Sequence, residues 1–452
     1  MSVQRIRDPI HGLISFDLND PIEAKVWEII KAPEFQRLRH IRQLGVSEFV
    51  FPSATHTRFA HSIGVFHNAR RLMKVIERDE GKRLDKARKA TALIAAVVHD
   101  VGHGPFSHAF EVAREAIAKE RGIEVIKKHE AFSASMITNP DGSLMSIIEN
   151  GHPGLAAEVS DLIKADNPID IYHAVVSSSF DADRLDYLVR DRHMTGVECG
   201  SIEQEWLIDN LIEWNIDVSQ DDDEPRIVRT FVFKAKGRQA AEDFLLARYR
   251  LYSQLYLHKT TRGFEQIIGA ILLHIARNWD RLDVLGLEPR NPFIRFFTPG
   301  GETLANYAAL NDSVFWATTR TLAESGDERS KLLAGRLLMR KRLKVLDVSV
   351  EFGHDPAQQA NAEMRLDQYL EDQLGWTVFK DTAPNHLYGV SGGESAKAHQ
   401  MVRVVSGGTA IEITDFPDTI INEWLRKKKN LVRYYFLEDA AQAEAERFMR
   451  GR

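Results

Sequence analysis

The strongest constraint on the fold of this chain is an almost uninterrupted apolar segment, residues 90–101, that contains an adjacent His-Asp pair near its end. The run A-T-A-L-I-A-A-V-V-H-D-V predicts a helix that is buried on most of its sides. The G-H-G-P sequence that follows opposes helix continuation, so the pair lies at a helix end. An imidazole and a carboxylate pack poorly in such a place but are common ligands of divalent metals. We therefore expect a metal site where this helix ends.

Histidines gather around this helix end. Seven of the 17 histidines fall between His56 and His129, and His61 lies near the start of a second predicted helix over residues 59–80. Histidine titrates near neutral pH and binds metals, so such a cluster indicates chemistry. The plain alternative is a hydrogen-bonded core residue, and for any single histidine taken alone it is the better interpretation. The cluster as a whole, beside the His-Asp pair and its glycines, favours a functional site.

The overall composition limits the remaining possibilities. With 452 residues the chain is long enough for one large core and a smaller appended domain. A net charge of −6 argues against a general nucleic-acid coat. The single cysteine, Cys199, excludes an internal disulfide and fits a reducing compartment. No apolar run reaches the length of a bilayer and the N-terminus lacks a signal-peptide core, so we expect a cytoplasmic protein without membrane contact.

Apolar periodicity along the rest of the chain predicts a mostly α protein. Residues 1–20 are predicted to form a short hairpin, because turn signals precede the extended L-I-S-F-D segment. Helical spacing extends over residues 203–213 and without a break over residues 240–278. Beyond residue 289 loops and short strands alternate with helices. We therefore predict a core domain over residues 1–285 and an α+β region over residues 286–452.

A metal site at the His-Asp pair needs further ligands from elsewhere in the chain. The segment D-A-D-R-L-D-Y-L-V-R-D, residues 181–191, offers four carboxylates, Asp181, Asp183, Asp186 and Asp191. Helical spacing places Asp183 and Asp191 on one side of this segment, together with Tyr187 and Arg190. Such acids could also be no more than a solvated face, so spacing alone leaves the choice of ligand open.

Several motifs together resemble one family. H-T-R-F-A-H-S-I-G-V, H-D-V-G-H-G-P-F-S-H, K-H-E and F-D-A-D-R-L-D-Y-L-V-R-D are similar to segments of the HD-domain phosphohydrolases. They look most like the branch of the SAM-and-HD-domain dNTP triphosphohydrolases and the bacterial dGTPase-like enzymes. The resemblance covers about residues 5–270. It implies a mostly α fold, with an HD-domain helical core, a small N-terminal hairpin and an α+β C-terminal region.

The resemblance also implies roles for individual residues. The ligands of a divalent cation (Mn, Fe, Zn or Mg) would be His61, His99, Asp100 and Asp183. The histidines around the α-phosphate would be His103, His108 and His129, with His108 as general acid and Glu111 orienting it. The cationic phosphate contacts would be Arg58, Arg184 and Arg248. The residues that hold the deoxyribose and the base would be Gln43, Leu44, Tyr187, Asp191 and Tyr256.

The function that follows from the resemblance is hydrolysis of a dNTP to a deoxynucleoside and inorganic triphosphate. Two alternatives stay open. One is a phosphatase or phosphodiesterase for another, signalling nucleotide, and the other is a nucleotide-sensing or nucleic-acid-binding regulator with a vestigial site. The resemblance further implies a homo-oligomer, with a tetramer favoured, in which the C-terminal region serves oligomerisation or regulation. A nucleotide effector, if one binds, would contact Gln36, Arg39, Arg340 and Lys344.

Overall fold

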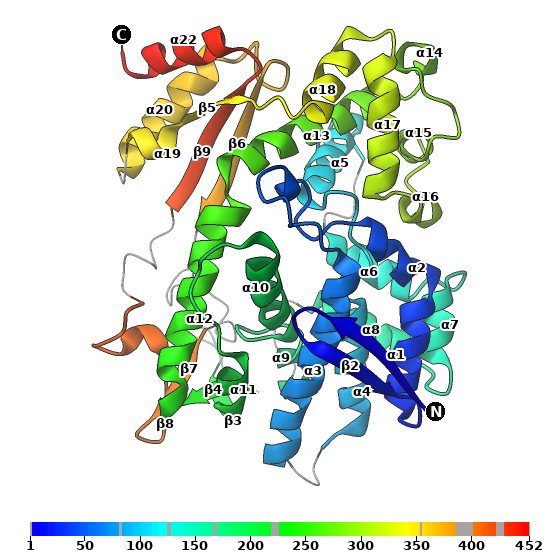
Figure 1. Ribbon diagram of the computed structural model, residues 1–452, viewed down its shortest axis with the longest axis vertical. Helices are drawn as coiled ribbons and strands as arrows, with labels where there is room; N and C mark the ends of the chain where they lie inside the picture. The colour runs from blue at the N-terminus through cyan, green and yellow to red at the C-terminus, as the bar shows by residue number, and fades with distance from the viewer. Residues whose placement is uncertain are drawn as a thin grey trace.

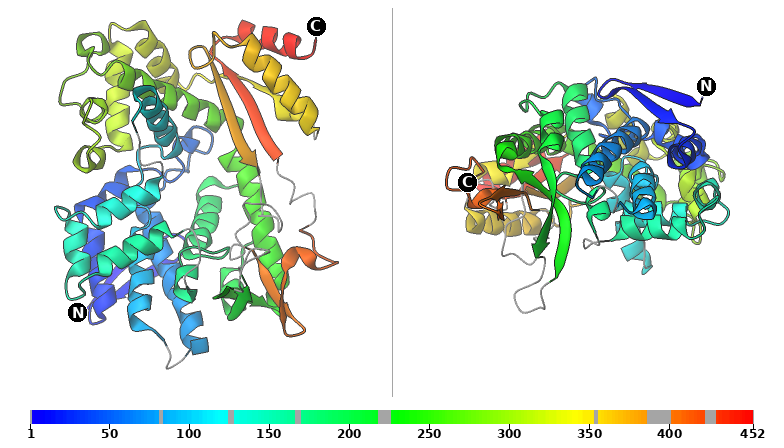
Figure 2. Two further views of the ribbon diagram at one scale, coloured as in Figure 1. Left: turned by 180° about the vertical axis from the view of Figure 1, so that it is seen from behind. Right: turned by 90° about the horizontal axis from the view of Figure 1, so that it is seen from below.

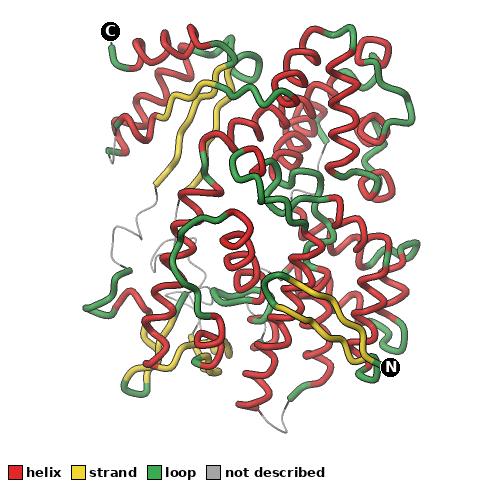
Figure 3. The backbone as a smooth tube through the Cα atoms, viewed as in Figure 1, coloured by secondary structure: helices red, strands yellow, loops and turns green. Residues whose placement is uncertain are grey.

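The computed structural model describes residues 2–80, 84–123, 128–165, 170–217, 226–352, 355–385, 401–421 and 429–451. The chain is mostly helical, as the sequence predicts (Figure 1 and Figure 3). The predicted hairpin is confirmed: β1 (Val3–Asp8) pairs antiparallel with β2 (Gly12–Asp17). Figure 1 shows it beside α1 (Pro21–Lys31) and α3 (Arg58–Glu80). No helix in these described ranges has both the length and the apolar character that crossing a membrane requires.

The predicted buried helix is α4 (Lys86–Val98), and it is central to the helical core. Asp85 caps its N-terminus by accepting hydrogen bonds from two backbone N–H groups, and residues 90–98 are all buried. It packs against α3 and α8 (Leu155–Lys164). The helix ends at Val98, three residues before the predicted end at residue 101, so His99 and Asp100 follow the helix. The other helices of this part of the chain are α2 (Pro33–Gln36), α5 (His108–Arg121), α6 (His129–Ile137), α7 (Ser143–Glu149), α8 (Leu155–Lys164), α9 (Ile171–Ala174) and α10 (Ala182–Thr195).

The predicted helix over residues 203–213 is wrong in its second half. Helix α11 (Gln204–Asp209) ends at Asn210, and Leu211–Asp217 forms strand β3. This strand pairs antiparallel with β4 (Ile227–Lys234) along its whole length. The sequence L-I-E-W-N-I-D contains Ile and Trp residues that favour a sheet, and the pairing partner decides the outcome.

The predicted continuous helix over residues 240–278 is also wrong, because the structure divides it. Helix α12 (Arg238–Leu251) passes into one π-helical turn, Tyr252–Tyr256, and α13 (Lys259–Arg277) starts anew after His258. His258 has an extended backbone, and its side chain accepts the N–H of Thr260 as an N-cap. π-Turns are often found at functional sites, and this one places two tyrosines at the cavity described below.

The C-terminal part adds helices and two small sheets. One sheet has the order β3-β4-β7-β8, with β7 parallel to β4, and the other has the order β5-β9-β6. Figure 1 and Figure 2 show these sheets at opposite ends of the molecule. The strands are β5 (Lys344–Asp347), β6 (Val378–Asn385), β7 (Arg403–Ser406), β8 (Thr409–Glu412) and β9 (Lys429–Phe436). The helices are α14 (Leu282–Leu285), α15 (Pro292–Phe297), α16 (Leu304–Ala308), α17 (Asp312–Glu324), α18 (Glu328–Leu338), α19 (Val348–Glu351), α20 (Pro356–Tyr369) and α22 (Asp439–Met449).

The main hydrophobic core extends across the predicted boundary at residue 285. Phe293 and Phe315 belong to the same buried cluster as Leu93 and Phe110. A smaller cluster, which includes Leu366 and Tyr434, lies between β5-β9-β6 and the helices packed on it. The division into residues 1–285 and 286–452 therefore stays a prediction, and the two parts share a core.

Candidate functional site

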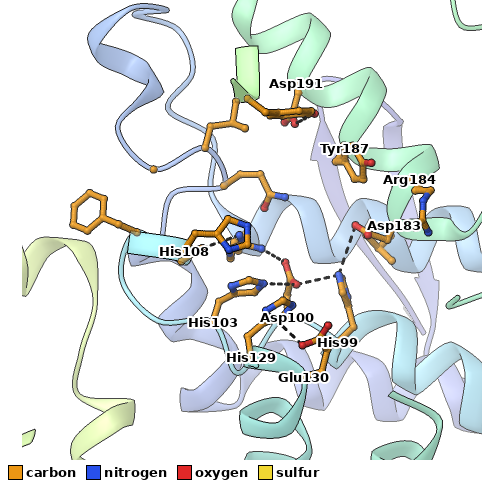
Figure 4. A pocket seen from close by; sticks show the side chains of 18 of the residues that line it. His99, Asp100, His103, His108, His129, Glu130, Asp183, Arg184, Tyr187 and Asp191 are labelled. Atoms are coloured by element: carbon orange, nitrogen blue, oxygen red, sulfur yellow. Dashed lines mark hydrogen bonds and ion pairs between the residues drawn. The ribbon is translucent and has the colours of Figure 1, made fainter. Parts of the chain in front are cut away.

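Helix ends place the predicted metal ligands around one cavity. His61 lies in the first turn of α3, His99 and Asp100 directly follow α4, and Asp183 lies in the first turn of α10. The cavity has a volume of about 700 Å³. Figure 4 shows His99, Asp100 and Asp183 directed toward one another in it.

Imidazole nitrogens and carboxylate oxygens converge at the inner end of the cavity. His61 Nε2 lies 3.0 Å from Asp183 Oδ1 and 3.8 Å from Asp100 Oδ2. His99 Nε2 lies 3.2 Å from Asp100 Oδ1 and 3.8 Å from Asp183 Oδ1. The Nε2 atoms of His61 and His99 are buried, and neither makes a hydrogen bond of good geometry. Buried polar atoms are usually paired, so these two nitrogens are suited to bind a cation. The donor set of two histidines and two aspartates fits a divalent metal.

Asp100 lies between two groups of potential ligands. Among the described residues, the donor atoms of His61, His99 and Asp183 lie close enough for one cation, and so do those of Asp100, His103 and His129. Asp100 Oδ2 also accepts a 2.6 Å hydrogen bond from Arg58. Burial alone would raise the pKa of Asp100, but His99, Arg58 and His103 hold it well below its usual range. The carboxylate is therefore ionised and available to a metal.

A buried network of charged side chains contacts Nδ1 of His61, the ring nitrogen that does not face Asp183. Asp186, with 0% exposure, lies 2.8 Å from His61 Nδ1 through Oδ2 and 2.6 Å from His11 Nε2 through Oδ1. Arg190 donates two hydrogen bonds to Asp186, and a third, of 2.9 Å, to Asp8 in the hairpin. Burial lowers the pKa of His61, but the carboxylates of Asp183 and Asp186 outweigh it and raise that pKa to about 10. A carboxylate that accepts from the other ring nitrogen of a metal-ligating histidine fixes the orientation of its ring.

The histidines that the resemblance assigns to the α-phosphate lie next to this centre. The rings of His103 and His129 stack with centroids 3.7 Å apart. Glu111 lies 3.2 Å from Nδ1 of His129 through one oxygen and 3.2 Å from Nδ1 of His108 through the other. Burial lowers the pKa of His129, but Glu111 more than offsets this and raises it. The side chain of His108 is 76% exposed, so it faces the open part of the cavity.

The predicted phosphate contacts all line the cavity. Arg58 donates to Asp100 and, at 2.8 Å, to the hydroxyl of Ser107. Arg184 donates to Asp181 and to the carbonyl of Ser178, which fixes its guanidinium close to Asp183. Arg248 has a buried Nε without a hydrogen-bond partner among the described residues, which favours an anionic ligand.

The opposite end of the cavity is formed by the residues expected to hold sugar and base. Asp191 accepts a 2.7 Å hydrogen bond from the hydroxyl of Tyr256 and lies 2.7 Å from Nε2 of His56. The rings of Tyr187 and Tyr256 meet edge to face at 6.3 Å. Gln43 and Leu44 also line the cavity, as do several residues that the sequence did not single out. These include Tyr252, Glu130, Ser177, Thr261, Arg262 and Glu265.

None of the four predicted effector residues lines the cavity, although the structure describes all of them. Gln36 and Arg39 are joined by a 2.8 Å hydrogen bond, and Arg39 lies over the ring of Phe59. Arg340 donates to the carbonyl of Phe49, and Lys344 pairs with Asp439 at 3.1 Å. Their role in binding an effector stays a prediction.

Comparison with known proteins identifies the class to which this site belongs. Residues 58–188 match the family described as HD domain. This segment therefore resembles an HD domain, and both candidate ligand groups found among the described residues lie within it.

Individual relatives place the chain more closely. It is 31% identical to the uncharacterized protein YwfO of Bacillus subtilis, over 68% of this chain and 64% of that protein. It is 32% identical to the deoxynucleoside triphosphate triphosphohydrolase SAMHD1 of Homo sapiens, over 43% of this chain and 33% of that enzyme. A phosphohydrolase from Bacteroides thetaiotaomicron shares its fold, with 24% identity, a TM-score of 0.72, and coverage of 96% of this chain and 99% of that one. The chain spans less than two thirds of the length of both curated relatives, so its activity has to be argued from the site.

Proposed function

We propose that the protein is a metal-dependent dNTP triphosphohydrolase that releases a deoxynucleoside and inorganic triphosphate. One observation carries the proposal: His99, Asp100 and Asp183 of the candidate metal group line the same cavity as Tyr187, Asp191 and Tyr256. A cavity of about 700 Å³ is in the range that holds a nucleotide-sized ligand. The similarity to SAMHD1 over 43% of this chain supports the same substrate class.

His61, His99, Asp100 and Asp183 are the residues that would hold the cation. When bound, a divalent cation supplies Lewis acidity toward a phosphate oxygen and makes water more acidic. Arg58, Arg184 and Arg248 then neutralise the polyphosphate and the charge that develops on it. The side chains of Arg58 and Arg184 are held by buried or backbone partners, so little reorganisation of these two is needed when an anion binds.

The leaving 5′-oxygen needs a proton, and His108 is the proposed donor. Glu111 lies 3.2 Å from Nδ1 of His108 and orients the ring, so the doubly protonated imidazolium would donate its Nε2 proton to the leaving oxygen. The same carboxylate orients His129, so both rings keep fixed positions relative to His103. At the other end, Tyr187 and Tyr256 are proposed to pack against the sugar and leave no room for a 2′-hydroxyl.

The test is incubation of Mn²⁺-loaded protein with each dNTP and each NTP, singly and in mixtures, with chromatographic detection of nucleoside and triphosphate. Mixtures are included because an enzyme that needs a nucleotide effector is silent with one substrate. Deoxynucleoside plus triphosphate from dNTPs alone is the expected result, and Asp183→Ala is the inactive control. Release of phosphate or pyrophosphate instead would support a different nucleotide phosphohydrolase. Nucleic-acid binding with steep salt dependence and no turnover would support a regulator.

We also propose a homo-oligomer, with a tetramer favoured. Size-exclusion chromatography with light scattering, with and without added nucleotide, measures the assembly directly. A mass of one 51.4 kDa chain under all nucleotide conditions would contradict this proposal.

A further inference from the structure

The loop between α4 and α5 has an unusual backbone. Phe106 and Ser107 have φ angles of 52° and 44°, values that L side chains rarely adopt. The loop contains His103 and leads directly into His108. Such a conformation persists only where surrounding contacts hold it in place, and it is often found at functional sites.

Residues far along the chain supply those contacts. Tyr307 donates a 2.6 Å hydrogen bond to the carbonyl of Gly102. Arg37 donates to the carbonyl of His103 at 2.8 Å and to the carbonyl of Leu310 at 3.0 Å, so it joins the loop to the segment before α17. A Cβ on Gly104 would lie 3.2 Å from the Tyr307 hydroxyl and 2.7 Å from the ring of Phe110. The loop is therefore packed tightly against residues 307–312.

Asp312, the first residue of α17, makes the central contact. It is 4% exposed, and its Oδ1 accepts the N–H of Phe106 at 3.1 Å. Its Oδ2 accepts the N–H of Arg42 at 2.8 Å, and Arg42 immediately precedes the cavity residues Gln43 and Leu44. One carboxylate thus joins the loop of the catalytic histidines to the segment expected to contact the sugar and base.

We propose that Asp312 is a positioning residue that fixes the 101–107 loop and the 42–44 segment relative to each other. Asp312 does not line the cavity itself, so it acts through the two backbone segments that it binds. The arrangement keeps His103 and His108 at a set distance from Gln43. The two hydrogen bonds of Asp312 do not depend on what the protein hydrolyses; only the expected change in kcat rests on the proposed function.

The chemistry of the two contacts explains why a carboxylate is needed. Both partners are backbone N–H donors, so both side-chain oxygens have to accept. An asparagine offers one acceptor and would direct an NH₂ group at the second N–H. Asp312→Asn should therefore free one of the two segments, and Asp312→Ala should free both.

Hydrogen exchange measured by mass spectrometry on the full chain tests the positioning role without any substrate. In Asp312→Ala, exchange in peptides that cover residues 38–46 and 101–110 should accelerate about tenfold or more, because a hydrogen bond to an ionised group is lost in each. Asn311→Ala is the matched control: Asn311 caps α17 through the N–H of Val314, and no hydrogen bond from its side chain to either segment is found among the described residues. Thermal unfolding establishes that each variant is folded. If Asp312→Ala does not fold, Asp312→Asn is measured instead, and hydrogen exchange should accelerate in at least one of the two peptides.

The kinetic readout separates positioning from general destabilisation. With the dNTP substrates defined above, kcat of Asp312→Asn should fall about tenfold or more, since a small misplacement of catalytic groups is costly, while KM and bound Mn²⁺ change little. Wild-type exchange in both peptides of a folded Asp312 variant, or equal acceleration in Asn311→Ala, would overturn the inference. If the protein hydrolyses no dNTP, the proposed function fails, and the exchange experiment still decides the role of Asp312.

Discussion

Asp186 offers a sharp test of how the metal centre is built. The change Asp186→Asn keeps the shape of the side chain but removes the charge that faces His61, His11 and Arg190. Burial alone would raise the pKa of Asp186, but Arg190 and the hydrogen bonds with His11 and His61 hold it well below the usual range. The wild-type side chain is thus a carboxylate at neutral pH. The variant loses the negative charge that favours a proton on Nδ1 of His61, the tautomer in which Nε2 can bind a metal.

The size of the effect follows from these contacts. Loss of a second-shell partner of a metal-ligating histidine typically lowers metal affinity about 10- to 100-fold, which is about 1.4–2.7 kcal/mol. Loss of one partner of a buried ion pair costs about 3–5 kcal/mol of stability. Arg190 keeps its contact with Asp8 in this variant, so we expect a loss of unfolding free energy of about 3 kcal/mol, near the lower limit.

The assay is calorimetric titration of Mn²⁺ into metal-free protein, with urea unfolding of the same samples. Asp8→Asn is the matched control, since it also weakens the buried pair with Arg190 but leaves the contact between Asp186 and His61 in place. It should lose stability and keep its Mn²⁺ affinity within about threefold. Wild-type Mn²⁺ affinity in Asp186→Asn, or an equal loss in Asp8→Asn, would refute the reasoning.

Three further outcomes are expected. His108→Ala should retain Mn²⁺, measured by mass spectrometry of metals, and lose about a hundredfold or more in kcat; an unchanged rate would exclude it as the acid. Gly64→Ala should lower both stability and Mn²⁺ affinity, because the new Cβ would lie 1.9 Å from Asp186 Oδ1, and titration of this variant checks it. Burial raises the pKa of Asp312 to about 6, although the N–H groups of Arg42 and Phe106 oppose this. The folded state therefore binds this proton more tightly than the unfolded state, so the unfolding free energy of wild type relative to Asp312→Asn should fall by about 2 kcal/mol between pH 4 and pH 7, as measured with urea. A flat difference would contradict that assignment.

The sequence singles out the expected metal ligands because they lie in short motifs at helix ends. His99 and Asp100 follow an apolar run whose end is marked by glycines, and His61 and Asp183 each begin a recognisable helix. The structure brings these four side chains together. Their partners are harder to predict, because the contact between His11 and Asp186 joins residues 175 positions apart and leaves no mark in local spacing.

Secondary-structure elements that depend on nearby residues were also predicted better than elements that depend on contacts with distant segments. The hairpin and α4 are specified by local turn signals and apolar content, and both were predicted. Strand β3 depends on its pairing with β4, so helical spacing in 203–213 was misleading. The π-turn at Tyr252–Tyr256 depends on how α12 and α13 pack around the cavity, and composition alone gives no indication of it.

The segment that matches the HD domain contains all four expected metal ligands but not the residues that surround and support them. Residues 58–188 exclude Asp8 and His11, which meet the network behind His61, and exclude Asp191 and Tyr256 at the sugar end. Asp312 lies still further along the chain and fixes the loop between His99 and His108. A buried network of charges is weak evidence for stability, since desolvation offsets much of the attraction. Its value here is geometric, because it orients the metal donors from segments that fold around the HD domain, and the hairpin and α17 are therefore part of the functional site.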